Sequence, residues 1–129
     1  MNTINKLLCI LFVVIVFTPG VALSKHIHKE KWYQDQWCAG RGSTEVVRMD
    51  HTRCDCLTPT NAVEVDFAKK FYEAIGQSLY YSMQTGHRAG VLLILESPAD
   101  RTYWDRLNSV VERFNLPIDL WKIEDVHQN

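Results

Sequence analysis

The sequence predicts an α/β sandwich of the α+β kind, with helices flanking a mixed central sheet that contains a three-strand meander. Two observations carry this prediction. Three short segments that are predicted strands, separated by turn residues, precede the amphipathic segment 68–85, and the first of them is rich in β-branched residues. The unbroken apolar run Val91–Leu95 then has the composition of a buried central strand. Strands that come first as a meander and later alternate with helices are typical of a mixed sheet covered by helices.

The elements are expected in the following order. A short polar helix with interleaved aromatic residues covers 25–39, and Gly40 and Gly42 end it. Strands follow at 44–49, 53–58 and 62–67, joined by turns at 50–51 and 59–61. The clearest helix covers 68–85, the buried strand covers 91–95, and a last helix and strand cover 100–114 and 117–123.

The first residues have the pattern of a secretory signal peptide. Lys6 precedes an uncharged apolar run over 7–17, and small residues Ala22 and Ser24 stand where signal peptidase requires them. The run is shorter than the roughly 20 apolar residues that cross a bilayer. We therefore expect residues 1–24 to be removed and residues 25–129 to form a single domain outside the cytoplasm, in the periplasm or secreted.

The processed chain keeps Cys38, Cys54 and Cys56 in a compartment where thiols oxidise. Cys54 and Cys56 share a face of one strand and do not suit pairing with each other. A disulfide between Cys38 and either of them is expected, with one thiol left over.

The charge of the processed chain limits its partners. Residues 25–129 hold thirteen Lys or Arg and fifteen Asp or Glu, a net charge of −2. Proteins that coat nucleic acid by bulk electrostatics are usually strongly basic. Any contact with nucleic acid is therefore expected to be local.

Three carboxylates are expected to converge on the meander. Asp55 lies in the second strand, and Glu64 and Asp66 lie two residues apart on one face of the third. Adjacent strands stand about 4.8 Å apart, so like charges would repel unless a cation neutralised them. Mg²⁺ or Mn²⁺ is the ion that such oxygen ligands bind, and it can activate a water molecule for phosphodiester hydrolysis.

The polar face of the following helix would overhang this site with Lys70, Glu73, Gln77 and Tyr81. Two plainer interpretations compete with the metal site. The alternating acidic strand is often only the solvent-facing side of a sheet in a structural domain. The polar helix face is likewise often no more than a solvated surface.

The order of Asp55, Glu64 between two valines and the helix segment Gln77-Ser78-Leu79-Tyr80-Tyr81 resembles the PD-(D/E)XK nuclease superfamily. Its exonuclease branch carries a Gln-x-x-x-Tyr motif on the helix after the catalytic strand. The similarity covers roughly residues 45–95. It implies a restriction-endonuclease-like fold and a Mg²⁺- or Mn²⁺-dependent nuclease activity.

The resemblance also implies roles for individual residues. Asp55 and Glu64 would bind metal, Gln77 and Tyr81 would orient the substrate and the site, and Glu45 would match an additional acid before the hairpin. Asp66 stands where the superfamily has Lys, so Lys69 or Lys70 would have to replace that lysine from the helix.

The sequence therefore predicts an exported, divalent-metal-dependent phosphodiesterase that acts on nucleic acid. The alternative is a catalytically inactive nuclease-like scaffold that serves as a secreted binding or effector module. The replacement of Lys by Asp66 and the weak net charge favour this alternative.

Overall fold

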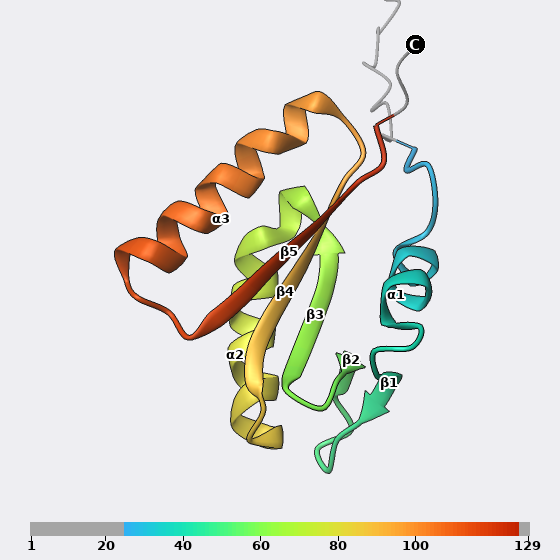
Figure 1. Cartoon of the computed structure of the whole chain (residues 1–129), viewed down its shortest axis with the longest axis vertical. Helices are drawn as coiled ribbons and strands as arrows, with labels where there is room; N and C mark the ends of the chain where they lie inside the picture. The colour runs from blue at the N-terminus through green and yellow to red at the C-terminus, as the bar shows by residue number, and fades with distance from the viewer. Residues whose placement is uncertain (1–24, 127–129) are drawn as a thin grey trace, which may run out of the picture.

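A computed structural model describes residues 25–126, which form one five-stranded mixed sheet flanked by three α-helices (Figure 1). The predicted signal peptide at 1–24 lies outside the described residues. The helices and strands are, in chain order, α1 (Glu30–Cys38), β1 (Ser43–Val47), β2 (Arg53–Leu57), β3 (Asn61–Phe67), α2 (Phe71–Thr85), β4 (Arg88–Leu95), α3 (Arg101–Arg113) and β5 (Ile118–Glu124). Two 3₁₀ turns, η1 (Ala68–Lys70) and η2 (Pro98–Asp100), precede α2 and α3.

The sheet has the strand order β1-β2-β3-β4-β5. The first three strands pair antiparallel, as the predicted meander requires, and β3, β4 and β5 pair parallel. Parallel neighbours need a crossover, which α2 and α3 provide. The predicted fold class and the predicted order of elements are therefore confirmed.

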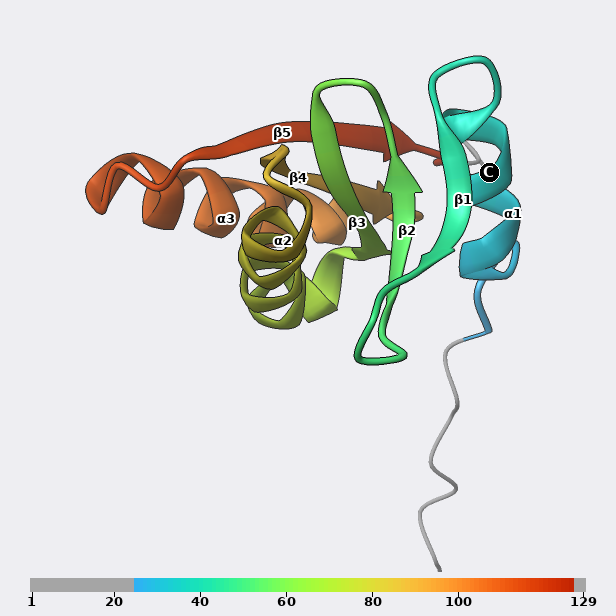
Figure 2. The ribbon, with the colours of Figure 1, turned by 90° about the horizontal axis from the view of Figure 1, so that it is seen from below.

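Hydrophobic side chains pack on both faces of the sheet. Val91, Leu93 and Leu95 of β4 face α2 and α3, whereas Leu92 and Ile94 belong to the core that α1 covers. Figure 2 shows α2 and α3 together on one side of the sheet and α1 beyond β1. The unbroken apolar run of β4 follows from this burial on two faces, because neither set of alternating side chains reaches water.

A disulfide joins Cys38 at the end of α1 to Cys56 in β2, and Cys54 is a buried free thiol. The bridge selects one of the two pairings that the sequence left open. It is compatible with a compartment outside the cytoplasm, where disulfides persist. Within residues 25–126, no helix is both long and apolar enough to cross a membrane.

We expect reduction of this disulfide to lower the free energy of unfolding by about 3 kcal/mol, because the bridge closes a loop with a sequence separation of 18. Urea unfolding with and without dithiothreitol measures the effect. Cys38→Ser should lose the sensitivity to dithiothreitol and Cys54→Ala should keep it. Equal sensitivity in the two variants would show that the bridge does not tie the fold.

Candidate functional site

The site is built where β2 and β3 part. Backbone pairing between these strands is recorded only at Cys56 with Val63 and at Leu57 with Ala62. Beyond that point, the side chain of Asp55 lies between the strands, and its Oδ2 accepts the backbone N–H of Val65 at 2.8 Å. The carboxylate therefore takes the place of a backbone carbonyl in the ladder at this point of β3.

Four carboxyl groups meet where this pairing ends, and we call them the acidic cluster: Glu30 of α1, Asp55 of β2, and Glu64 and Asp66 of β3. Side-chain hydrogen bonds join Asp55 to Glu64 and Glu30 to Asp66. Only 6% of Glu64 and 4% of Asp66 is exposed. The interpretation of this strand as a solvent-facing acidic strand is therefore wrong.

Burial and mutual repulsion raise the pKa of every member of the acidic cluster. Burial is the main cause in each, and it raises the pKa of Glu64 to about 10, with further contributions from the charges of Asp55 and Asp66. The pKa of Asp66 rises to about 7 and that of Asp55 to about 6. A carboxyl that keeps its proton can donate it to a neighbouring carboxylate, which lowers the repulsion between the two acids.

Glu64 keeps an unused ligand atom. Its Oε2 is buried and has no hydrogen-bond partner in the described part of the chain. Between residues 25 and 126, no group of three His, Cys, Asp or Glu side chains is arranged so that it could hold a metal ion. The donor set of carboxylate oxygens suits a hard divalent cation, but in this structure the carboxyl groups bond to one another in pairs.

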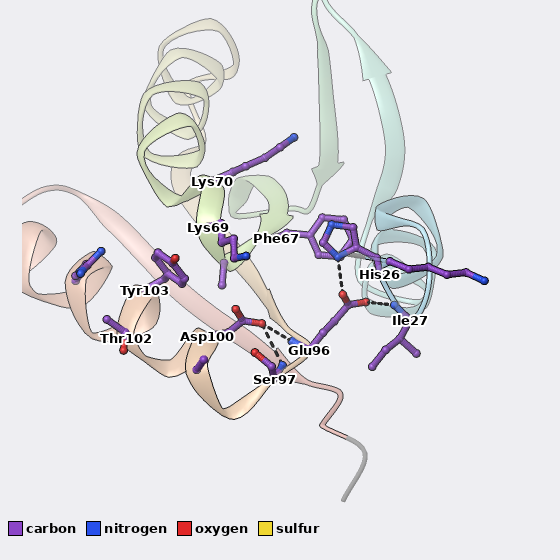
Figure 3. A pocket seen from close by; sticks show the side chains of 14 residues that line it. His26, Ile27, Phe67, Lys69, Lys70, Glu96, Ser97, Asp100, Thr102 and Tyr103 are labelled. Carbon is purple, nitrogen blue, oxygen red and sulfur yellow. Dashed lines mark hydrogen bonds and ion pairs between the residues drawn. The ribbon is translucent and has the colours of Figure 1, made fainter. Parts of the chain in front are cut away.

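Lys70, the residue before α2, provides positive charge at the acidic cluster. Its Nζ lies 3.6 Å from Oδ1 of Asp66, which also accepts the backbone N–H of Phe67 at 2.8 Å. Lys69 points in a different direction, into the space between η1 and η2, as Figure 3 shows. Of the two lysines that the sequence offered, Lys70 is the one at the carboxylates.

Two site residues on α1 were not expected from the sequence. Glu30 joins the acidic cluster, and buried Gln34 donates through Nε2 to the backbone oxygen of Asp55 at 2.7 Å and to Oε1 of Glu45 at 3.1 Å. The two residues lie one helical turn apart, on the same side as buried Tyr33 and Cys38. The sequence signal for them was the four-residue spacing of Glu30 and Gln34, which places two polar side chains on the same side of the helix as Tyr33 and Cys38.

The remaining expected residues are divided between the site and its surroundings. Glu45 lies at the margin, with a left-handed backbone (φ 54°), and pairs with Arg53 at 3.6 Å. Its charge still acts on Asp55. Glu45 is therefore a neighbour of the acidic cluster and Glu30 is the additional member.

On α2, Tyr81 is buried, which corrects its expected place on the polar face. It packs with Cys54 and Ala62. Burial and the charges of Glu64 and Asp55 raise its pKa to about 12. Glu73 and Gln77 are exposed. The charge of Glu73 contributes to the raised pKa of Lys70, and no hydrogen bond joins the side chain of Gln77 to another described residue. The Gln-x-x-x-Tyr motif thus divides between a surface residue and a core residue.

The fold and the acidic cluster define a mixed α+β domain with a buried carboxylate site on its meander. No family model, no curated protein and no solved structure matches the chain. Any function for this site therefore has to be argued from its own geometry.

The raised pKa values predict an unusual pH dependence of stability. The folded chain holds protons on these carboxyls at pH values where the unfolded chain, with Glu at about 4.5, has lost them. The free energy of unfolding should therefore fall as pH rises from about 4.5, by about 1.4 kcal/mol per pH unit for each such proton. The loss from Asp66 ends near pH 7 and that from Glu64 near pH 10.

Urea unfolding in EDTA between pH 4.5 and 9 measures this slope. Glu64→Gln should flatten it, because the amide is neutral at every pH and has nearly the shape of the protonated acid. Glu112→Gln, on the exposed side of α3, is the matched control and should leave the slope unchanged. Stability that rises with pH would contradict the assignment of shared protons.

Proposed function

We propose that this protein is an exported, divalent-metal-dependent phosphodiesterase that acts on nucleic acid, with the acidic cluster as its catalytic site. The observation that carries the proposal is the meeting of four carboxyl groups from α1, β2 and β3, with a buried oxygen of Glu64 that has no hydrogen-bond partner among the described residues. If these acids served only to stabilise the fold through ion pairs, each would be expected to face a Lys or Arg side chain. Here Lys70 is the one cation that pairs with a member of the cluster within the described residues.

Burial of several carboxyl groups is costly unless their charge is neutralised. Without a cation, protons on the pairs Asp55–Glu64 and Glu30–Asp66 reduce the buried negative charge. A hard divalent ion prefers the same kind of carboxylate oxygen, and its binding would displace those protons and draw the paired carboxyl groups together around the ion. Asp55 and Glu64 are the proposed principal ligands, and Asp66 and Glu30 complete the set.

The bound ion would lower the pKa of a water molecule and stabilise the charge that develops on the phosphate. Lys70 is half exposed beside Asp66, so its ammonium can position the attacking water at the solvent side of the cluster. Asp55 is itself fixed by the N–H of Val65, and Gln34 holds the backbone of Asp55 from the other side. These contacts keep Asp55 in place while ligands exchange.

Two further observations support the proposal. The mixed sheet with its meander and flanking helices is the type of fold that the resemblance to PD-(D/E)XK nucleases implies. The Cys38–Cys56 bridge agrees with export to the periplasm or the medium, which the predicted signal peptide at 1–24 also favours.

A second candidate function is an inactive nuclease-like scaffold that works as a secreted binding or effector module. The observation that favours it is Asp66, which stands where the resemblance requires Lys and is bonded to Glu30, Lys70 and the N–H of Phe67. An acid held in this way adds negative charge where the active superfamily has a positive group.

Cleavage of labelled single- and double-stranded DNA and RNA by the purified protein, with Mg²⁺ or Mn²⁺ and with EDTA, tests the first function. We expect metal-dependent cutting that falls at least about a hundredfold in Glu64→Gln and in Asp55→Asn, because each change removes a charged ligand. Lys70→Gln should also slow cutting.

Matched controls separate the site from the surface. Glu112→Gln should cut normally. Lys31→Gln should also cut normally. Lys31 makes an exposed ion pair with Asp35, four residues later, at 2.8 Å, whereas Lys70 pairs with the buried Asp66, four residues earlier, at 3.6 Å. No cutting with either metal, from a sample that circular dichroism shows to be folded, would leave the binding module as the function.

Metal binding can also be tested without activity. At pH 7 the cluster holds at least the proton of Glu64, so Mn²⁺ binding should release about one proton or more. Calorimetric titration in two buffers of different ionisation enthalpy counts these protons. Glu64→Gln should release fewer. Heat that is independent of the buffer would count against ion binding at these carboxyls.

A further inference from the structure

A second site lies beside the acidic cluster, in a cavity that shares Lys70 with that cluster. It has a volume of about 610 Å³, within the usual range for small-ligand sites. Its walls come from the segment 25–27, from the end of β3 with η1, and from the turn η2 with the start of α3 (Figure 3). The cavity is therefore outside the carboxyl ends of the parallel strands β3 and β4, where ligands of open α/β sheets commonly bind.

The two carboxylates that line this cavity already have partners. Glu96 accepts from Nδ1 of His26 at 2.6 Å, from the backbone N–H of Ile27 at 2.9 Å and from the hydroxyl of Tyr33 at 2.9 Å. Asp100 accepts the backbone N–H groups of Glu96 and Ser97 at 2.9 and 3.1 Å. Both acids are engaged in holding the wall of the cavity.

Three cationic side chains of the lining, Lys25, Lys69 and Arg106, make no ion pair within the described residues. The side chain of Lys69 points into the cavity (Figure 3). The guanidinium of Arg106 stands over the ring of Tyr103, 5.5 Å from its centroid. A cavity with free cations and occupied acids, in a domain of net negative charge, is suited to an anion.

The lining also includes apolar and aromatic side chains, together with the hydroxyl-bearing Ser97 and Thr102. Phe67, Ala68 and Tyr103 are among the lining residues, and His26 stacks on Phe67 with ring centroids 3.5 Å apart. We propose that this cavity binds a phosphate group carried by a nucleotide, with Lys69 and Arg106 at the phosphate and the nucleoside against Phe67, Ala68 and Tyr103. Arg is suited to phosphate because its planar fork donates two parallel hydrogen bonds.

The phosphate part of this inference stands on the cavity alone, and the nucleotide part rests on the proposed function. Lys70 connects the two sites, because it lines the cavity and pairs with Asp66 of the acidic cluster. A phosphorylated strand end held by Lys69 and Arg106 would lie next to the carboxylates. The ligand is therefore either a free mononucleotide or the phosphorylated end of a nucleic-acid strand.

Calorimetric titration of the purified protein in EDTA, which stops metal-dependent cutting, tests the site. The probes are a nucleoside monophosphate, the same nucleoside and inorganic phosphate. The monophosphate should bind at least about tenfold more tightly than the nucleoside, and added salt should weaken it. Equal binding of nucleotide and nucleoside would overturn the phosphate site. Inorganic phosphate that binds as tightly as the monophosphate would overturn the nucleotide assignment.

Variants locate the binding. Lys69→Gln and Arg106→Gln should each weaken monophosphate binding by about tenfold, and Arg106→Lys should recover part of the loss. Arg113→Gln, an exposed arginine at the other end of α3, is the matched control and should bind normally. A loss in Arg113→Gln as large as that in Arg106→Gln would show non-specific attraction and overturn the proposal.

The source of the phosphate is read from fluorescence anisotropy with labelled oligonucleotides that carry or lack a terminal phosphate. A preference of tenfold or more for the phosphorylated strand assigns the site to strand ends, and no preference assigns it to free mononucleotides. Glu112→Gln, on the exposed side of α3, should bind both ligands as the unchanged protein does. If the unchanged protein binds the monophosphate but does not cleave nucleic acid, only the proposed enzymatic function is overturned. If it cleaves nucleic acid but does not bind the monophosphate, only the proposed phosphate site in the cavity is overturned.

Discussion

The hydrogen bond from the N–H of Val65 to the carboxylate of Asp55 is the contact on which the rest of the site depends. Two adjacent antiparallel strands normally close their ladder with backbone groups alone. Here the carboxylate of Asp55 accepts the N–H of Val65, and backbone pairing between β2 and β3 stops at Cys56 and Val63, next to Glu64. Without that acceptor, a buried N–H would lose its partner, and the strands could close only by expelling the carboxylates between them.

The acidic cluster lowers the local stability of the fold in exchange for a group of buried carboxyls. Glu64 and Asp66 occupy positions on β3 that apolar side chains would fill at lower cost, as Val91 and Leu93 do on β4. The sheet tolerates them because its centre is strong elsewhere, with β4 buried on both faces. A domain that spends stability on buried acids at one point of its sheet is typical of a functional site, where the local rules of packing are broken for a purpose.

Local patterns were enough to predict the order of elements, the mixed sheet and the meeting of Asp55 with Glu64. The alternation of side chains along a strand determines the face of the sheet on which Asp55 and Glu64 lie, and this alternation depends only on the local sequence. Glu30 and Gln34 could not be placed in the same way, since their approach depends on how α1 crosses the sheet. Tyr81 was assigned to the polar face for a related reason: its cover is the β1–β2 hairpin with Cys54, which helical periodicity in α2 does not reveal.

The bridge between Cys38 and Cys56 has a consequence beyond loop closure. Its two ends belong to the helix that carries Glu30 and Gln34 and to the strand that carries Asp55. The redox state of the sulfurs and the arrangement of the carboxyls are therefore thermodynamically linked. Any ligand that prefers the assembled acids must make the bridge harder to reduce, and a reducing environment must weaken the binding of that ligand by the same factor. The protein is thus built so that its site assembles most firmly where thiols are oxidised.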